Sequence, residues 1–464
     1  MTENVQTPGT LGSRDPFASL LLAAAALLLA SLLAAASLSG PLAWTVGLIY
    51  ICYDTWLLTT MVRASRRAIV EQLRERPAPP GTLPTLAVLI AARNEQGALP
   101  LALDAVLAQD DLPEQLIVID DGSTDGTLSL LRERYGVVLA EGSRLGRGPA
   151  VTVLAKPNSG KARSLNEALP LCQAELVVTL DADTILDAGA LRAVRTDFAR
   201  NPGLSAGCGV LRPLAQPGWL APVFELYQTF EYLRSFLWRM AWSRDQTLVL
   251  VSGAFAIFRR EALLAVGGFD PASHVEDYEL LFRLHRRSWE ERQGPLHVRV
   301  VGEARATTDV PSRPGAFLRQ RTRWFAGFIE TMFKNHDMVG QARYGRLGTF
   351  HLLVKTADTL LPIYGLSAFL ALLLLLLRGA GIPPLILAAL VAKFVFDFCC
   401  HVYCLSLHQR WQRQPLTARL FGRAALATLT EPYFFQLFRQ LGALLGWVAF
   451  MRGRVVWAPQ RTVK

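Results

Sequence analysis

The chain has 464 residues, of which 51% are hydrophobic, and its formal net charge is +10. This length excludes a single small domain, and so high an apolar fraction is unusual for a protein without membrane-spanning segments. The arginines lie mainly beside apolar segments and no nucleic-acid-binding motif occurs, so we expect membrane lipid and an anionic substrate as partners, and no nucleic acid.

Two long apolar stretches follow a predicted cytoplasmic tail at residues 1–16. Residues 17–38 carry no charge and residues 41–62 carry only Asp54, and each stretch can cross about 30 Å of hydrocarbon as a helix. We therefore expect two transmembrane helices within residues 17–62. A cleaved signal peptide is the alternative, but Arg14 alone is a poor charged region and a second span follows at once.

A cluster of arginines comes directly after the second span, at Arg63, Arg66, Arg67, Arg74 and Arg76. Because positive charge is retained on the cytoplasmic side of a membrane, this cluster places the central region in the cytoplasm, below the cell (inner) membrane. A linker at residues 63–84, which is rich in proline, leads into that region.

From residue 85 the pattern changes to strands that alternate with helices. The expected strands are 85–91, 115–119, 151–155 and 175–180, and the expected helices are 98–108, 127–135 and 162–169. This alternation predicts an α/β domain over residues 85–315 with a Rossmann-like, mostly parallel sheet, inserted between transmembrane helices. Ligands of such sheets bind outside the carboxyl ends of the strands.

Polar residues collect at those strand ends. The first strand is followed by Ala92-Arg93-Asn94-Glu95, the second by Asp120-Asp121-Gly122-Ser123 and the fourth by Asp181-Ala182-Asp183. Several carboxylates together are costly unless a cation or a donor-rich ligand compensates them. Mg²⁺ or Mn²⁺ would do so, since both ions take carboxylate oxygens together with substrate phosphates.

A glycine loop, Asn158-Ser159-Gly160-Lys161, opens the third helix and suits a phosphate group. Taken alone, Gly160-Lys161 is equally typical of an ordinary helix cap, and Asp121-Gly122 of an ordinary turn. The order in which these motifs occur together is what favours a nucleotide site.

A further acidic run, Glu276-Asp277, opens a helix near residue 276. Asp277 is either a carboxylate that favours the positive end of the helix dipole or a general base.

Residues 317–328, FLRQRTRWFAGF, are both apolar and strongly cationic, and they open an expected amphipathic interface region at 316–348. On a helix Gln320, Arg323 and Trp324 are related by i, i+3 and i+4, so they occupy one arc and can act on one ligand. An amphipathic helix lying on the membrane is the alternative. Arg319 and Arg321 are expected to serve lipid headgroups.

Apolar stretches at residues 360–377, 382–407 and 433–451 predict about three transmembrane or interface helices within 349–451, before a basic tail at 452–464. The side of the membrane on which the chain ends stays open. Six cysteines show no disulfide framework, and Cys400, His401 and Cys404 are expected to pack in a span rather than bind metal.

Taken in order, these motifs resemble those of the inverting family 2 glycosyltransferases of the membrane-embedded, cellulose-synthase-like kind. The resemblance covers residues 83–333 and includes Val251-Ser252-Gly253-Ala254-Phe255 and Gln320-x-x-Arg323-Trp324. Residues 225–244, residues 251–258 and the tail with Trp457 are most similar to bacterial poly-N-acetylglucosamine synthases, with chitin-oligomer and hyaluronan synthases nearby. The fold implied is a nucleotide-sugar glycosyltransferase of type A.

The resemblance also implies a role for each matching residue. The general base would be Asp277, and Asp183 with Asp181 would hold the metal. The nucleotide sugar would be bound by Ala92, Glu95, Asp120, Asp121, Lys161, Asp181 and Arg323. The acceptor would be bordered by Ser252, Gly253, Phe255, Glu276, Gln320 and Trp324.

The expected reaction is transfer of a sugar from a UDP-sugar, UDP-N-acetylglucosamine first, onto a growing β-linked polysaccharide that leaves through the chain's own helices, with an accessory membrane or export subunit as a possible partner. Arg93 stands where many polysaccharide synthases carry tyrosine, so transfer of one sugar to a lipid acceptor is the alternative. A catalytically inactive nucleotide-binding transport or scaffold protein is disfavoured, because Asp183, Asp277 and the Gln-x-x-Arg-Trp set are all present.

Overall fold

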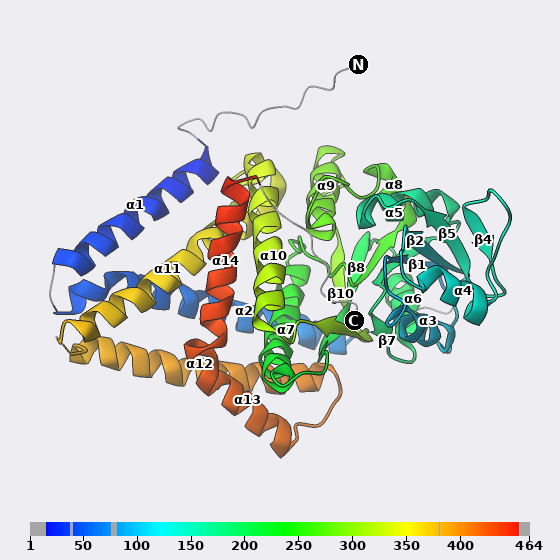
Figure 1. Cartoon of the computed structure of the whole chain (residues 1–464). Helices are drawn as coiled ribbons and strands as arrows, with labels where there is room; N and C mark the ends of the chain where they lie inside the picture. Colours follow the sequence, from blue (N-terminus) through cyan, green and yellow to red (C-terminus); the bar gives the residue numbers. More distant parts are fainter. Residues whose placement is uncertain (1–14, 38–39, 76–80, 380, 454–464) are drawn as a thin grey trace. The chain divides into compact units, whose positions relative to one another are not determined.

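The computed structural model describes residues 15–37, 40–75, 81–379 and 381–453 (Figure 1). The chain forms two compact units. The membrane unit comprises Met1–Arg63, Pro314–Leu405 and Thr417–Lys464, and the sheet unit comprises Ala64–Arg313 and Ser406–Leu416. Most of the predicted tail at 1–16, residues 76–80 of the linker and residues 454–464 of the basic tail lie outside the described residues.

The sheet unit alternates strands and helices as the sequence pattern predicts. Its strands are β1 (Leu86–Ala92), β2 (Gln115–Asp121), β3 (Val138–Leu139), β4 (Leu145–Arg147), β5 (Thr152–Lys156), β6 (Leu176–Asp181), β7 (Ile185–Leu186), β8 (Ala206–Ala215), β9 (Phe255–Arg259) and β10 (Val298–Val310). Its helices are α3 (Leu99–Leu107), α4 (Thr127–Tyr135), α5 (Lys161–Ala168), α6 (Ala190–Arg200), α7 (Ala221–Arg244), α8 (Arg260–Ala265) and α9 (Glu276–Glu290).

Within the described residues the strands form one ten-stranded sheet in the order β3-β4-β5-β2-β1-β6-β9-β8-β10-β7. The four strands β5, β2, β1 and β6 are parallel, which confirms the predicted α/β class. The pairs β6–β9, β8–β9 and β10–β7 are antiparallel, which the sequence pattern did not predict. The chain steps outward from β1 through β2 to β5 and then returns to β6 on the other side of β1, so the switch point lies at the ends of β1, β2 and β6.

Burial explains why the central strands read as continuous apolar runs. Residues 86–90 of β1 and 117–119 of β2 are buried, since helices cover the parallel strands on their faces. α5 packs against β1 and β2, while α7 packs against β8 and β10. The acidic residues Asp120 and Asp121 end β2 and are themselves buried.

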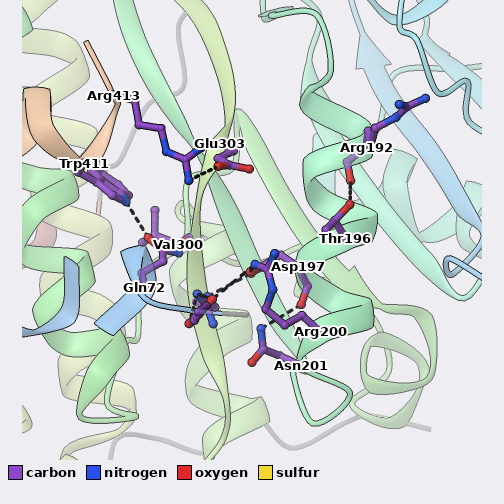
Figure 2. Close-up of polar contacts among 12 residues, drawn as sticks. Gln72, Arg192, Thr196, Asp197, Arg200, Asn201, Val300, Glu303, Trp411 and Arg413 are labelled. Carbon is purple, nitrogen blue, oxygen red and sulfur yellow. Dashed lines mark hydrogen bonds and ion pairs between the residues drawn. The ribbon is translucent and has the colours of Figure 1, made fainter. Parts of the chain in front are cut away.

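The sheet unit also includes the ends of two long helices and the short segment that follows the second. The indole N–H of Trp411 donates to Oε1 of Gln72 at 2.6 Å, and Nε2 of Gln72 donates to the carbonyl of Val300 in β10 at 3.0 Å (Figure 2). Beside them Arg413 forms an ion pair with Glu303 at 3.4 Å (Figure 2). These contacts hold β10 where its register with β8 shifts, between Val300 and Arg305.

A second group of charges braces β10 against α6. The Arg299 guanidinium lies 3.1 Å from Asp197 and 2.6 Å from Glu75, and Arg200 lies 3.4 Å from Asp197. Burial raises the pKa of Asp197 to about 6, against the effect of both arginines. Asn201 donates to the Asp197 carbonyl and thereby closes the end of α6 (Figure 2).

The α-helices of the membrane unit are α1 (Pro16–Ser37), α2 (Thr45–Leu73, which continues into the sheet unit), α10 (Pro314–Lys334), α11 (Leu352–Leu377), α12 (Pro384–Trp411, which also continues into the sheet unit), α13 (Ala418–Thr430) and α14 (Phe435–Met451). Among the described residues four helices are long and apolar enough to cross a membrane, and a bent pair, 418–433 with 435–451, makes a fifth candidate. As one span, this bent pair would begin before the apolar stretch predicted at 433–451, and Arg419 and Arg423 lie in its first half.

Three charged side chains from α2 and α12 lie together inside the spans of this unit. Nζ of Lys393 in α12 is 2.6 Å from Asp54 of α2, and it also pairs with Asp397 one turn further along α12. Asp54, the single charge of the second predicted span, is therefore compensated, as charges within a membrane must be. In the same helix His401 Nδ1 lies 3.3 Å from the Thr428 hydroxyl, and no metal-binding group of three or more His, Cys, Asp or Glu side chains occurs in the described part of the chain.

Candidate active site

Acidic residues end the two strands that flank β1 at the switch point of the sheet. Ala92, at the end of β1, pairs in register with Asp120, and Ala91 pairs with Asp181. The sheet therefore brings the ends of the first, second and sixth strands together, as predicted. Asp120 is 4% exposed, its Oδ1 has no hydrogen-bond partner among the described residues, and burial raises its pKa. An acceptor atom of this kind suits a donor group on a ligand.

Asp121 organises the glycine loop. Its Oδ1 accepts from the backbone N–H of Ser159 at 2.8 Å and its Oδ2 from that of Gly160 at 2.9 Å. Nζ of Lys156 donates to Oδ1 at 3.0 Å, and the two side chains are 2% (Lys156) and 6% (Asp121) exposed. Burial alone would raise the pKa of Asp121, but these donors outweigh it and lower the pKa below its usual value.

Two glycines allow the loops at this edge to approach each other. Gly122 has φ +68°, and a Cβ there would lie 2.6 Å from the backbone nitrogen of Asn158. Gly160 has φ +92° immediately before α5. Both conformations favour glycine, so the sequences Asp-Asp-Gly and Ser-Gly-Lys are explained by backbone geometry as well as by charge.

The neighbouring loop between β1 and α3 is tied to the same region. The backbone N–H of Asn94 donates to the Ser123 hydroxyl at 3.0 Å, and Oδ1 of Asn94 accepts from the backbone N–H of Thr124 at 2.7 Å. The backbone N–H of Glu95 donates to the buried Thr127 hydroxyl at 3.0 Å. Arg93 is exposed directly after β1. The partly buried Glu95 side chain is thus held at the edge where Asp120 and Asp121 lie.

Lys161 joins two parts of the chain that are far apart in sequence. Its Nζ lies 2.6 Å from Asp181 Oδ1, 3.2 Å from Glu276 Oε1 and 3.3 Å from the carbonyl oxygen of Gly253. Burial opposes the charge on this lysine, but Asp181 and Glu276 outweigh it and raise the pKa of Lys161. The lysine is therefore a fixed cation at the centre of the site.

Asp277 lies beside that cation, in the first turn of α9. Its Oδ2 accepts from the backbone N–H of Gly253 at 2.7 Å and its Oδ1 accepts from the backbone N–H of Tyr278 at 2.9 Å. Burial and the neighbouring Glu276 raise the pKa of Asp277 to about 6, while Lys161 and the two N–H donors act in the opposite direction. A carboxylate with a pKa raised in this way is compatible with a general base.

The start of α9 is braced by a pair of glycines and an asparagine. Asn166 of α5 exchanges two hydrogen bonds with the backbone of Phe269, at 2.7 and 2.8 Å. Gly268 has φ +77°, and a Cβ at that position would lie 2.3 Å from Asn166 Oδ1. Arg283 donates to the carbonyl of Gly268 and pairs with the buried Glu279. These contacts set the position of Asp277 relative to α5.

The pair of carboxylates after β6 offers oxygen ligands for a divalent cation. Asp181 and Asp183 are partly exposed, and Oδ1 of Asp183 accepts from the Thr308 hydroxyl of β10 at 3.1 Å. Two carboxylates completed by diphosphate oxygens and water form a set that suits Mg²⁺ or Mn²⁺. The residues present are therefore compatible with such an ion.

The predicted acceptor residues lie in different surroundings. Ser252 and Gly253 are partly exposed beside Asp277, whereas the Phe255 ring is fully buried, because Gly209 leaves room for it in the neighbouring strand β8. The Phe255 side chain thus lies in the core and not on the surface of the site.

The other three predicted residues lie on α10, which belongs to the membrane unit. Gln320 is 5% exposed, whereas Arg323 and Trp324 are partly exposed.

Two residues of this site were not predicted from the sequence. Lys156 ends β5 and pairs with Asp121 in the register of β2 and β5, and the Thr308 hydroxyl of β10 donates to Asp183. Lys156 could have been predicted, because a lysine at the end of a buried apolar strand needs a partner for its charge. No local signal marked Thr308.

The strand order and the acidic residues at the switch point define a glycosyltransferase fold of type A. A mannosyltransferase from Pyrobaculum calidifontis, solved in complex with GDP-Man and Mn²⁺, is similar over 84% of this chain and 99% of its own, with a TM-score of 0.54 and 21% identity. A likeness at this level of identity concerns the fold. The family model described as glycosyltransferase like family 2 matches residues 84–327, and the chain belongs to that family.

Relatives with curated names give a narrower comparison. A poly-beta-1,6-N-acetyl-D-glucosamine synthase of Staphylococcus aureus (strain MSSA476) is 28% identical over 280 residues, which is 60% of this chain and 62% of the relative. The synthase of the same name from Staphylococcus epidermidis is 27% identical over 294 residues, 62% of this chain and 65% of the relative. The chain thus spans less than two thirds of the length of these relatives.

Proposed function

We propose that the chain transfers a sugar from a UDP-sugar, with UDP-N-acetylglucosamine the first candidate, to a growing β-linked polysaccharide and inverts the anomeric centre. The observation that carries this proposal is the placement of Asp277, a carboxylate with a pKa of about 6 beside the cation Lys161, which in turn contacts Asp181. A base, a cation and a strand-end carboxylate are what sugar transfer from a nucleotide requires. The likeness to the staphylococcal synthases supports a polysaccharide acceptor.

The reaction assigns one step to each group. Asp277 takes the proton of an acceptor hydroxyl as the oxygen attacks the anomeric carbon, and the bond between that carbon and UDP breaks with both electrons going to the diphosphate. Lys161 and Arg323 would stabilise the negative charge that develops on UDP. A single displacement with one base inverts the configuration of the sugar.

The nucleotide would lie over the ends of β1 and β2. Asp120 offers an acceptor oxygen without a partner among the described residues, and the backbone of Ala92 and the side chain of Glu95 lie at the same edge. Asp121 would act mainly through the glycine loop, because its oxygens already accept from Ser159, Gly160 and Lys156. Asp181 and Asp183 would hold Mg²⁺ or Mn²⁺, which when bound neutralises part of the diphosphate charge.

For the acceptor, Ser252, Gly253 and Glu276 of the sheet unit would border the sugar. The resemblance to family 2 glycosyltransferases gives Gln320 and Trp324 of α10 the same role. Phe255 would contribute through its backbone, since its ring is buried. The arginines after the second span support a cytoplasmic sheet unit at the cell membrane, and the polymer would leave through the helices of the membrane unit, with an accessory export subunit as a further partner.

Product size tests the proposal. Membranes that contain the full chain are supplied with labelled UDP-N-acetylglucosamine and Mn²⁺ or Mg²⁺, and a water-soluble polymer is expected. Asp277→Asn should abolish its formation while UDP binding persists, whereas Glu290→Gln, at the exposed far end of α9, should leave it unchanged. If the Asp277→Asn variant still transfers sugar, Asp277 is not the general base.

A second candidate function is transfer of one sugar to a lipid acceptor. It is favoured by Arg93, which is exposed directly after β1 at a position where many polysaccharide synthases carry tyrosine. The same assay separates the two, because a product found only as a monosaccharide lipid in the chloroform phase would exclude the polymer. A donor screen with UDP-glucose, UDP-N-acetylglucosamine and UDP-glucuronate would identify the sugar.

A further inference from the structure

Two glycines of α14 let α10 pack closely against that helix. A Cβ at Gly442 would lie 2.6 Å from Cβ of Arg321, and a Cβ at Gly446 would lie 2.9 Å from Cβ of Phe325 and 3.1 Å from the backbone nitrogen of Ala326. Side-chain rotation cannot relieve these contacts, because they involve Cβ and backbone atoms. Any residue other than glycine would therefore push the two helices apart.

The contact points repeat at helical spacing on both partners. Gly442 and Gly446 are one turn apart on α14, and Arg321 and Phe325 are one turn apart on α10. α10 and α14 run side by side (Figure 1). Two contacts one turn apart set both the distance between the helices and the rotation of α10 about its axis. We call these four residues the α10 seat.

The seat is linked directly to a residue of the proposed site. The guanidinium of Arg321 lies 4.5 Å from the centroid of the Trp324 ring and 4.6 Å from that of Phe317. The expectation that Arg321 serves lipid headgroups does not fit this placement, since its cationic group lies over two aromatic rings. Arg321 thus rests on Gly442 through its Cβ and on Trp324 through its guanidinium.

Helix geometry connects the seat to the rest of the motif. At about 100° per residue, the arc of Gln320, Arg323 and Trp324 is centred about 120° around the helix from the seat residues Arg321 and Phe325. A rotation or outward shift of α10 at the seat therefore moves all three side chains together. Sub-ångström placement matters here, because a misplacement of about 1 Å in a reacting complex can cost about 100-fold in rate.

We propose that Gly442 and Gly446 are positioning residues, which fix the orientation of Gln320, Arg323 and Trp324 by letting α10 pack closely on α14. Arg321, which contacts both Gly442 and the Trp324 ring, couples the position of α10 to the position of that ring. This inference rests on the proposed function, because it assumes that these three side chains act on the diphosphate and the acceptor. General packing of the helices is the competing explanation. It predicts loss of folded protein, whereas a positioning role predicts loss of turnover in a folded protein.

The test compares single glycine substitutions in the full chain, reconstituted in lipid nanodiscs. Gly446→Ala and Gly442→Ala should lower kcat by about 100-fold, whereas the melting temperature should stay at the wild-type value. The affinity for UDP with Mn²⁺, measured by calorimetry, should fall no further than in Arg323→Ala. Gly422→Ala is the matched control, because a Cβ at this glycine of α13 meets no atom within 4 Å. Arg323→Ala shows the kcat expected when the motif itself is lost.

A second substitution shows whether close approach of the helices is the cause. Phe325→Gly removes the facing Cβ, so the double variant Gly446→Ala with Phe325→Gly should recover much of the lost kcat. The inference is overturned if Gly446→Ala is as active as Gly422→Ala, if the melting temperature falls together with kcat, or if the double variant shows no recovery. A wild-type chain without any transfer would instead refute the proposed function.

Discussion

Replacement of Lys156 by methionine is expected to damage the sheet unit far more than its place at a strand end suggests. The substitution keeps most of the side-chain volume but leaves Asp121 without its cation. Because Lys156 and Asp121 are 2% and 6% exposed, water cannot replace the lost partner. Removing one member of a buried ion pair costs about 3–5 kcal/mol, and Asp121 keeps its bonds from Ser159 and Gly160, so we take the lower value, about 3 kcal/mol.

This magnitude gives a measurable shift. For a domain of this size, about 3 kcal/mol corresponds to a fall in melting temperature of about 6–12 °C. Thermal unfolding of the detergent-solubilised chain, followed with and without UDP, is the assay. UDP should also bind more weakly to Lys156→Met, because the loop that contains Ser159 and Gly160 loses the anchor that orients it.

A matched control is available on the same side of the domain. Arg144 pairs with Glu167 at 2.5 Å, and their side chains are 54% and 40% exposed, so Arg144→Met should cost less than about 1 kcal/mol. The double variant Lys156→Met with Asp121→Asn should lose less than the sum of the single losses, since it leaves no unpaired charge. If Lys156→Met has the same melting temperature as Arg144→Met, the buried pair of Lys156 and Asp121 contributes no more to stability than the exposed pair.

Two further predictions concern the base and its support. Because the base must be deprotonated and burial raises the pKa of Asp277 to about 6, kcat/KM should fall as the pH drops through about 6. Glu276→Gln removes a negative charge beside Asp277, so the fall in kcat/KM should occur at a lower pH than in the wild type. If the fall occurs at the same pH, Glu276 does not raise the pKa of Asp277. Gly268→Ala should reduce the melting temperature and the activity more than Gly267→Ala does. Both glycines have positive φ, but only a Cβ at Gly268 would meet Asn166. Equal losses in the two variants would show that the Asn166 contact is unimportant.

Much of the site's location could be predicted because the chemistry lies at strand ends. Buried strands read as apolar runs, so the polar residues that end them stand out, and the parallel order of β5, β2, β1 and β6 brings those ends to one edge. Ala92, Asp120 and Asp181 were found in this way. The apolar spans could be predicted for a similar reason, since about 20 apolar residues are needed to cross the hydrocarbon.

The sequence by itself thus determined the class of fold, the apolar spans and the edge of the sheet that carries the acidic residues, because these follow from local periodicity and composition. Only the tertiary structure decided that Lys156 faces Asp121, that Lys161 meets Asp181 and Glu276, and that the Phe255 ring is buried. It also decided that α10 lies against two glycines of α14. Strand register and helix packing set these contacts. The contacts join residues that are far apart in the sequence, so no local sequence pattern predicts them.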